Sequence, residues 1–408
     1  ELHCYDPFTK GDNLLFSCDP KVEFSLPVFN DQSYAIAFYV QSDTTKGNQK
    51  FRDIYYARID TKDSAKVLVA HSSEFVPQGM MITPKASLKF ASDNSFLSFG
   101  FVEIPEPEND SIPDFEKVKL DIWVWDADYT PVTKKYSKRT FDRINYTALY
   151  YFDNGGSVVT LGDESMPYID VDYEYLNENI LAASDKKYRI EQQWEAITRY
   201  DLYTINIATG ERTLLDEAAR YDGMSQSPDK RYFTYANVAD STWYLYDIKA
   251  GKTTDLTSNI DDIFWDDQED MPVLPTPAGR VQWYEEGDKF VISAKYDLWL
   301  FDATGKSSAV SLTEGLGNKT KTRFSINADL LYDTRKDSRS GLSGGGTILP
   351  DRPLILSGFN KVTKESSIYM KDIDNPKPKM KKLVEGPDSY RIVGEVISYE
   401  YPGIEDES

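Results

Sequence analysis

The chain is poor in the residues that build most catalytic and metal sites. Its 408 residues include two histidines, His3 and His71, and two cysteines, Cys4 and Cys18. Zinc sites are built mainly from His and Cys side chains, so a zinc site is not expected. The chain also lacks an apolar run of about 18 residues, which argues against a membrane-spanning helix. The given sequence contains no signal peptide, and a chain from which one had been removed would look the same.

Positive charge is scarce as well. The 67 Asp and Glu residues outnumber the 46 Lys and Arg residues, and the formal net charge is −21. Nucleic-acid binding needs a basic face to meet the phosphates, so no nucleic-acid partner is expected. A strong negative charge instead keeps a protein dispersed in water.

Aromatic residues, in contrast, are abundant and fall into a repeated pattern. The chain has 28 Tyr, 20 Phe and 7 Trp, which suit the half-buried surface of a β-sheet. Seven times an aromatic-rich strand runs into a short polar turn and then into a further strand. An apolar strand after an Asp, Asn or Gly turn precedes most of these hairpins, as in residues 227–235. The aromatic centres are His3, Tyr55, Trp123, Tyr203, Tyr244, Trp299 and Tyr369.

A hairpin repeated at this spacing predicts an all-β chain that forms a β-propeller of four-stranded antiparallel blades. The seven hairpins predict seven blades. Residues 148–161 are interpreted as the outer edge of the third blade, and they would raise the count to eight if they formed an independent hairpin. The longer intervals between hairpins predict loop insertions at 105–115, 266–279 and 336–346. A helix is predicted at 188–198.

We expect a single propeller domain over residues 1–408. The first hairpin begins at Leu2 with no strand ahead of it, so the chain is expected to enter the ring within a blade. An isolated two-stranded ribbon is marginal in water, which calls for partner strands from elsewhere. Residues 390–401 are strand-like and are the candidate for closing the ring.

Cys4 and Cys18 flank the turn of the first hairpin. If that hairpin pairs symmetrically, the two Cα atoms lie roughly 4.5–5.5 Å apart, which suits a cross-strand disulfide. A register slip of one residue would place the two sulfur atoms on opposite faces. Two reduced, half-buried thiols therefore remain the alternative to a disulfide.

One segment matches the G-x-S-x-G pattern of a serine nucleophile, with Ser343 at its centre. Such a serine needs a base to take its proton, and in α/β-hydrolases the histidine follows the serine in the chain. Both histidines precede Ser343, and no amphipathic helix follows it. We interpret the segment as a flexible Gly/Ser loop, His3 as a strand residue and His71 as the end of a strand. No catalytic residue is predicted.

An acidic cluster precedes the sixth hairpin. Oxygen-rich loops can hold Ca²⁺, but this cluster lacks EF-hand spacing and the glycine of the EF-hand loop. A solvated loop is the expectation in so acidic a chain, and neither a metal nor a cofactor is predicted. The cluster comprises Asp261, Asp262, Asp266, Asp267, Glu269 and Asp270.

Four ordered segments resemble a known family. They are VKLDIWVWDAD at 118–128, DQEDMPVLPTPAGRVQW at 267–283, KYDLWLFDATGKSSAVSLTEGLGNKTKTRFS at 295–325 and SGFNKVTKESSIYM at 357–370. Together they look like the N-terminal β-propeller of prolyl oligopeptidase-type serine peptidases (the S9 class), and most like a bacterial branch of it. The resemblance extends over most of the chain, from about residue 30 to about residue 383.

In that family the propeller covers the mouth of a C-terminal α/β-hydrolase domain and admits only flexible peptides. The catalytic Ser, Asp and His lie in the hydrolase domain, and this chain is expected to end before that domain begins. The resemblance implies a non-catalytic gating domain of a serine peptidase, peptide substrates as partners, and a periplasmic or secreted protein. Two alternatives stay open. One is a stand-alone propeller that binds a protein or a glycan, and the other is a propeller glycosidase with a carboxylate pair.

Overall fold

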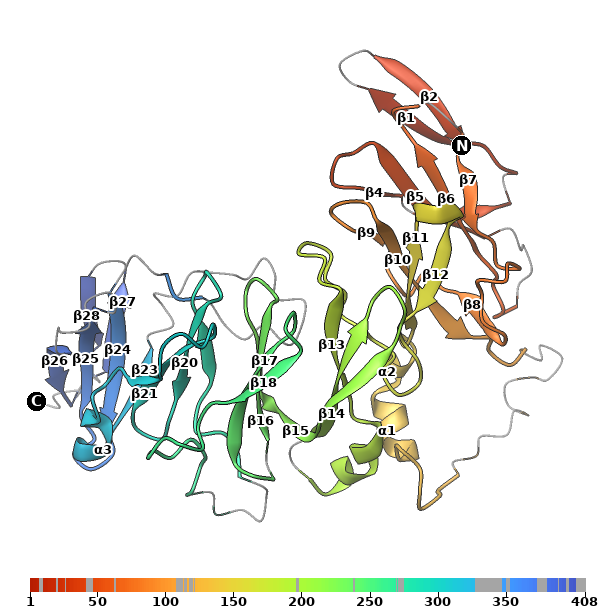
Figure 1. The fold of residues 1–408 in the computed structure, drawn as a ribbon. Helices are drawn as coiled ribbons and strands as arrows, with labels where there is room; N and C mark the ends of the chain where they lie inside the picture. The colour runs from red at the N-terminus through yellow and green to blue at the C-terminus, as the bar shows by residue number, and fades with distance from the viewer. Residues whose placement is uncertain are drawn as a thin grey trace, which may run out of the picture. The chain divides into compact units, whose positions relative to one another are not determined.

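In the computed structural model the chain divides into two compact units. Figure 1 labels their strands and helices. Unit 1 comprises Glu1–Glu191 and Leu202–Leu215, and unit 2 comprises Gln192–Asp201 and Asp216–Ser408. The single domain expected from the sequence stays a prediction. The described residues are 1–6, 10–19, 21–25, 27–41, 47–61, 64–107, 113, 116, 120, 122–195, 198–237, 239–268, 270, 275–326, 347–349, 353–372, 380–387, 389–393 and 396–400.

Unit 1 is built from antiparallel hairpins and sheets. The β1-β2 hairpin is followed by a sheet of order β3-β5-β6-β7, in which β4 also pairs with β5. The next sheet has the order β12-β11-β10-β8, in which β9 also pairs with β10. The strands are β1 (Leu2–Asp6), β2 (Gly11–Phe16), β3 (Glu23–Phe24), β4 (Val28–Phe29), β5 (Ala35–Gln41), β6 (Asp53–Arg58), β7 (Lys66–Val69), β8 (Met80–Ile82), β9 (Lys89–Phe90), β10 (Phe96–Glu103), β11 (Tyr146–Tyr151) and β12 (Ser157–Thr160).

Short helices interrupt this pattern. The Thr130 hydroxyl caps α1 by accepting a hydrogen bond from the Thr133 N–H at 3.1 Å, and Pro131 begins the helix, where its missing N–H is not needed. No helix among the described residues has the length and apolar character needed to cross a membrane. The helices that precede β14 are α1 (Pro131–Tyr136), α2 (Lys138–Phe141) and the 3₁₀ helices η1 (Asp153–Gly155) and η2 (Lys186–Gln193).

Unit 2 follows the same plan. Strands β14 and β15 contribute residues to both units, and the pairing of β15 with β16 is irregular between Arg220 and Ser225. Along the rest of the chain, from β13 onward, the sheet orders are β13-β14-β15-β16-β17-β18, β19-β20-β21-β22 and β23-β24-β25-β26, followed by the hairpin β27-β28. The remaining elements are β13 (Asn179–Ser184), β14 (Arg199–Asn206), β15 (Arg212–Gln226), β16 (Tyr232–Asn237), β17 (Thr242–Asp247), β18 (Lys252–Asp255), β19 (Val281–Trp283), β20 (Lys289–Ser293), β21 (Leu298–Asp302), β22 (Val310–Ser311), α3 (Leu316–Thr320), β23 (Thr322–Ile326), β24 (Leu354–Asn360), β25 (Ser366–Lys371), β26 (Lys381–Gly386), β27 (Ser389–Val393) and β28 (Val396–Glu400).

The central strands of the sheets are buried on both faces. Every residue of β5 and the first six residues of β10 are buried, whereas every residue of β18 is exposed. A Cβ atom added to Gly100 in β10 would lie 2.6 Å from the Ala86 Cβ, so only glycine fits there. Burial that falls from the central strands to an outer strand is what a propeller blade requires, because each blade packs between its neighbours.

The structure confirms an all-β chain of antiparallel propeller blades. All aromatic centres except Trp123 lie in strands, and the strand predicted within residues 227–235 forms as β16. Within the stretch 390–401, predicted to be strand-like, residues 390–393 lie in β27 and residues 396–400 form β28. The number of blades and the closing of a ring by the β27-β28 hairpin stay predictions.

The strand predicted around Trp123 is wrong. Residues 122–124 have no regular structure, and residues 125–126 form a turn. Strand β11 takes the expected place, because it pairs with β10 from Phe96↔Tyr151 to Phe101↔Tyr146, and β12 forms the outer edge. The helix predicted at 188–198 is the 3₁₀ helix η2, which begins and ends earlier. The loop predicted at 336–346 lies outside the described residues.

Candidate functional site

Aspartates near the start of three aromatic strands lock their blades. Each accepts a hydrogen bond from a backbone N–H that lies 17, 18 or 20 residues further along the chain. We call this contact the blade latch. It joins the beginning of one strand to the chain beyond the next turn. The three latches are Asp53 Oδ1 with the His71 N–H (2.8 Å), Asp201 Oδ1 with the Ala218 N–H (3.1 Å) and Asp297 Oδ1 with the Gly317 N–H (2.9 Å).

The Asp297 latch shows why these carboxylates are structural. Asp297 is 1% exposed, its Oδ1 also accepts the Thr313 hydroxyl at 2.5 Å, and its Oδ2 accepts the Asn318 N–H at 2.8 Å. These donors replace the water that a buried carboxylate loses. A Cβ atom on Gly317 would lie 2.6 Å from the Tyr296 carbonyl oxygen, so this latch also requires glycine.

Both histidines pair with carboxylates at strand ends. His71 Nδ1 lies 2.7 Å from Asp53 Oδ1, the oxygen that its backbone N–H also binds. His3 Nδ1 lies 3.1 Å from Asp12 Oδ1, and hydrogen bonds with Asp12 and then Glu1 raise the pKa of His3. The predictions that His3 lies in a strand and that His71 follows one are confirmed. Ser343 lies outside the described residues.

Cys4 and Cys18 are both free thiols in this structure. In the β1-β2 register Asn13 lies opposite Cys4, and Cys18 comes two residues after the end of β2. This register differs from the symmetric one that favours a cross-strand disulfide. A disulfide between the two cysteines stays a prediction.

The acidic cluster before β19 is tied to other side chains of unit 2. Asp262 Oδ2 accepts a hydrogen bond from Trp299 Nε1 at 2.7 Å, and Asp267 forms an ion pair with Lys295 at 2.6 Å. Glu269 lies outside the described residues. Within the part of the chain that the structure describes, no group of three or more His, Cys, Asp or Glu side chains is placed to hold a metal ion.

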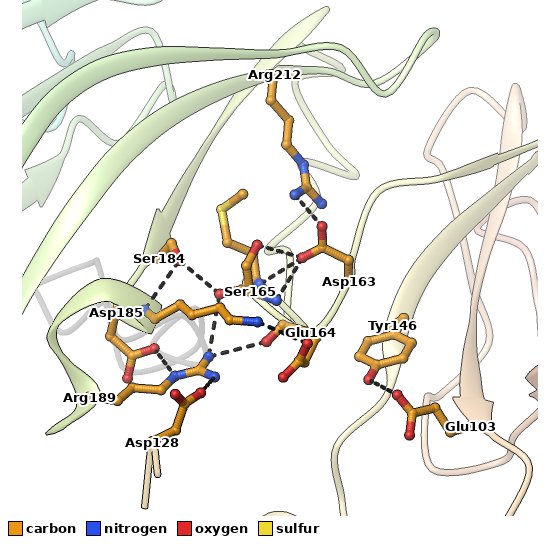
Figure 2. Close-up of polar contacts among 12 residues, drawn as sticks. Glu103, Asp128, Tyr146, Asp163, Glu164, Ser165, Ser184, Asp185, Arg189 and Arg212 are labelled. Atoms are coloured by element: carbon orange, nitrogen blue, oxygen red, sulfur yellow. Dashed lines mark hydrogen bonds and ion pairs between the residues drawn. The ribbon is translucent and has the colours of Figure 1, made fainter. Parts of the chain in front are cut away.

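A polar network in unit 1 is centred on Arg189 (Figure 2). The residue is 7% exposed, yet its guanidinium reaches three parts of the chain. Nε donates to Asp185 Oδ1 at 2.8 Å, and Nη1 donates to Asp128 Oδ2 at 3.1 Å. Nη2 donates to the Glu164 carbonyl at 3.2 Å. Burial lowers the pKa of Arg189, but the carboxylates of Asp185 and Asp128 outweigh burial and raise it.

A second arginine holds the loop that follows β12. Asp163 Oδ1 accepts the N–H and the hydroxyl of Ser165 at 2.8 and 2.6 Å, which makes an Asx turn. Its Oδ2 accepts Arg212 Nη1 at 2.6 Å. Burial raises the pKa of Asp163, but the hydrogen bonds from Ser165 and Arg212 lower it overall. Figure 2 shows the loop residues 163–165 between Arg212 and Arg189.

The edge of the network carries a further ion pair and a buried phenol. Lys186 Nζ lies 2.9 Å from Glu164 Oε2. Tyr146 donates its hydroxyl to Glu103 Oε1 at 3.1 Å, and burial together with Glu103 raises the pKa of Tyr146 to about 12. At neutral pH Tyr146 is therefore a fixed hydrogen-bond donor and not a proton acceptor.

The hydrogen bonds and ion pairs of Arg189 and Arg212 hold separate parts of the chain together, and we call this network the brace. Arginine stays charged in proteins, so Arg189 and Arg212 neither take nor give protons. Their donors are used by carboxylates and carbonyls of the loop, of Asp185 directly before η2, and of Asp128 before α1, which fixes these parts to one another. Sequence analysis missed this network. Its local clue was the i, i+4 pair of Asp185 and Arg189, whereas the contact to Asp128 spans 61 positions.

No family model and no curated protein matches the sequence of this chain. Solved structures of similar fold include a prolyl endopeptidase, with 12% identity over 91% of this chain and 43% of that chain and a TM-score of 0.30. Acylaminoacyl peptidase from Pyrococcus horikoshii is similar with 13% identity, coverage of 90% and 47%, and a TM-score of 0.28. A putative TolB from Agrobacterium tumefaciens is similar with 11% identity, coverage of 75% and 86%, and a TM-score of 0.25. The chain spans less than half the length of both peptidases, and at these TM-scores no function is taken from the neighbours.

Proposed function

We propose that this chain is the non-catalytic β-propeller of a prolyl oligopeptidase-type serine peptidase and restricts the access of peptides to an α/β-hydrolase domain. The observation that supports this most is that two of the four segments resembling the family coincide with blade elements, whereas the described residues of the segment 118–128 form no strand. The segment 295–325 covers β21, β22 and α3 and nearly all of β23, and it contains the Asp297 latch. The segment 357–370 spans the turn between β24 and β25.

The chemistry of the described residues supports a scaffold role. The carboxylates of the blade latches bind backbone N–H groups, and Arg189 and Arg212 brace a loop. Side chains used in this way make the blades rigid. A rigid propeller would select substrates by their size. A rigid propeller would pass an extended peptide and exclude a folded protein.

The first experiment separates this chain from the hydrolase domain. The 408-residue chain is incubated with short chromogenic peptides, and no hydrolysis above buffer is expected. A longer protein that includes the sequence encoded after Ser408 is expected to cleave them, and an alanine at its G-x-S-x-G serine should abolish cleavage. A stop codon directly after Ser408, or hydrolysis by this chain alone, would refute the proposal. A stop codon there would favour the alternative, a stand-alone propeller that binds a partner.

A second experiment tests gating in the longer protein. The same cleavage sequence is offered as a short peptide and as a loop of a folded domain, and only the peptide should be cut. Asp297→Ala, which breaks a blade latch, should raise cleavage of the folded substrate relative to the peptide. The matched control is Asp126→Ala at an exposed aspartate outside the strands. An unchanged ratio of the two rates in Asp297→Ala would contradict gating by the propeller.

A further inference from the structure

The segment that fails to form the third aromatic strand carries exposed apolar side chains. Trp125 is 89% exposed and Tyr136 is 85% exposed. Single exposed apolar residues are normal on protein surfaces, but a run of large ones within a short stretch of sequence is a candidate interaction site. We call residues 120 and 122–143 the aromatic–basic segment. Its exposed large apolar residues are Leu120, Ile122, Trp123, Val124, Trp125, Val132 and Tyr136.

The helical part of this segment is locally positive in an acidic chain. Residues 131–143 contain five basic side chains and one acidic side chain, whereas residues 122–130 contain Asp126 and Asp128 and no basic side chain, and the whole chain has a net charge of −21. Helices α1 and α2, which carry four of the five, have no buried residue. Among the described residues, the ion pairs that the structure contains involve other lysines and arginines. The basic side chains of the two helices are Lys134, Lys135, Lys138 and Arg139.

The aromatic–basic segment is anchored to unit 1 and does not hang free. Arg189 binds Asp128 at 3.1 Å, and its guanidinium carbon lies 5.4 Å from the centre of the Tyr129 ring. The Tyr129 ring in turn packs edge-on against Phe141 with ring centres 4.9 Å apart. Phe141 ends α2, so these contacts hold both sides of α1. These contacts therefore hold the segment that carries the exposed side chains in place.

We propose that the aromatic–basic segment docks on an anionic phospholipid bilayer. Tryptophan and tyrosine prefer the membrane–water interface, and lysine and arginine beside them are attracted to anionic headgroups. The composition favours a bilayer over a protein partner, because lysine is depleted in protein interfaces and three of the four basic residues on α1 and α2 are lysines. This inference is independent of the proposed peptidase function.

The net charge of the chain does not prevent such docking. At physiological ionic strength the Debye length is about 8 Å, so acidic groups further from the contact are screened. Near the bilayer, the local charge of the aromatic–basic segment decides the sign of the interaction. High salt should weaken binding, because at about 1 M salt the Debye length falls to about 3 Å.

The test measures co-sedimentation of the 408-residue chain with lipid vesicles. Vesicles of phosphatidylcholine with phosphatidylglycerol should bind the chain, and vesicles of phosphatidylcholine alone should bind it far less. The double variant Trp123→Ala with Trp125→Ala should bind about tenfold less tightly or worse, because it removes the interfacial aromatic rings. Lys134→Glu with Lys135→Glu should lose roughly 25-fold or more, since each basic residue contributes roughly fivefold.

Two matched controls separate the segment from general surface effects. Trp194→Ala removes another exposed tryptophan, and Lys249→Glu with Lys252→Glu reverses two exposed lysines near β18. Both controls should bind like the original chain, and circular dichroism should show that all variants are folded. The proposal is overturned if the chain ignores anionic vesicles or if the segment variants bind as well as the controls. It is also overturned if Trp125 supports self-association in light scattering in place of lipid binding, which would assign the segment to a second copy.

Discussion

Two segments of this chain have a similar sequence pattern and different environments. Residues 121–126 are Asp-Ile-Trp-Val-Trp-Asp, and residues 297–302 are Asp-Leu-Trp-Leu-Phe-Asp. In the second segment Leu298 is buried, and Phe301 stacks on Phe290 with ring centres 5.3 Å apart. In the first segment Ile122 and Trp125 are exposed. A strand-forming pattern therefore does not by itself determine whether a segment joins a sheet.

The difference lies in the partner strands available to each segment. Strand β21 lies between β20 and β22 and follows β20 after a short turn. Strand β10 is already paired with β11 on one edge and with β8 and β9 on the other. β11 places the small Ala148 opposite the large Phe99, and both residues are buried. The more compatible strand occupies the edge, and the aromatic–basic segment remains outside.

The largest expected effect comes from truncating the equivalent aromatic residue in each segment. Phe301→Ala should lower the free energy of unfolding by about 3–5 kcal/mol, because it leaves a cavity beside Phe290. Trp125→Ala should change that free energy by less than about 0.5 kcal/mol, because its side chain is exposed. Urea denaturation followed by circular dichroism measures both. Equal losses would show that residues 122–125 are packed in solution and would break the comparison.

The aspartates of the two segments should also differ. Asp297→Ala should lower the free energy of unfolding by about 3 kcal/mol, because the N–H groups of Gly317 and Asn318 lose their acceptor in a buried position. Asp297→Asn keeps one acceptor oxygen and should lose less. Asp126→Ala should change the free energy of unfolding by less than about 0.5 kcal/mol. Chemical denaturation of the three variants ranks them, and a neutral Asp297→Ala would contradict the blade latch.

Breaking the brace tests how the aromatic–basic segment is held. Arg189→Met should lower the free energy of unfolding by about 2 kcal/mol, because hydrogen bonds to carboxylates are lost. Hydrogen exchange should become faster in residues 122–130, since Asp128 and Tyr129 lose their contacts with Arg189. Arg139→Met, on the exposed face of α2, is the matched control and should leave both measurements unchanged. Unaltered exchange in Arg189→Met would mean that other contacts hold the segment.

The smallest effect concerns the aspartate that ends β21. Burial raises the pKa of Asp302, but hydrogen bonds from Thr304 and Ser307 lower it below its ordinary value of 3.8. Because the folded pKa is depressed, Asp302 contributes stability above its unfolded pKa, and this contribution is lost as the pH falls through the folded pKa. Thr304→Val should raise the pKa of Asp302 in an NMR titration of its carboxyl carbon. The control Thr254→Val, on exposed strand β18, should leave it unchanged, and an equal effect of both would refute the turn as the cause.

The local sequence pattern predicted most strands correctly but failed for the strand expected around Trp123. Alternating aromatic residues before a polar turn placed Tyr55, Tyr244 and Trp299 correctly, because neighbouring strands supply their partners. The same reasoning failed at Trp123, where the outcome depends on competition from β11 for the edge of β10. The Arg189 network was missed for a similar reason. Its contacts with Asp128 and Glu164 join positions 61 and 25 residues apart, which no local spacing reveals.

The blade latches also bear on how the chain folds as it is synthesised. Each latch closes a loop of only 17–20 residues, so the entropy lost on closure is small, and doubling such a loop would add only about 0.6 kcal/mol. Contacts this short in sequence can form early, because little chain has to be ordered to make them. A blade can therefore complete itself soon after its last strand leaves the ribosome, before later strands exist to compete for its edges.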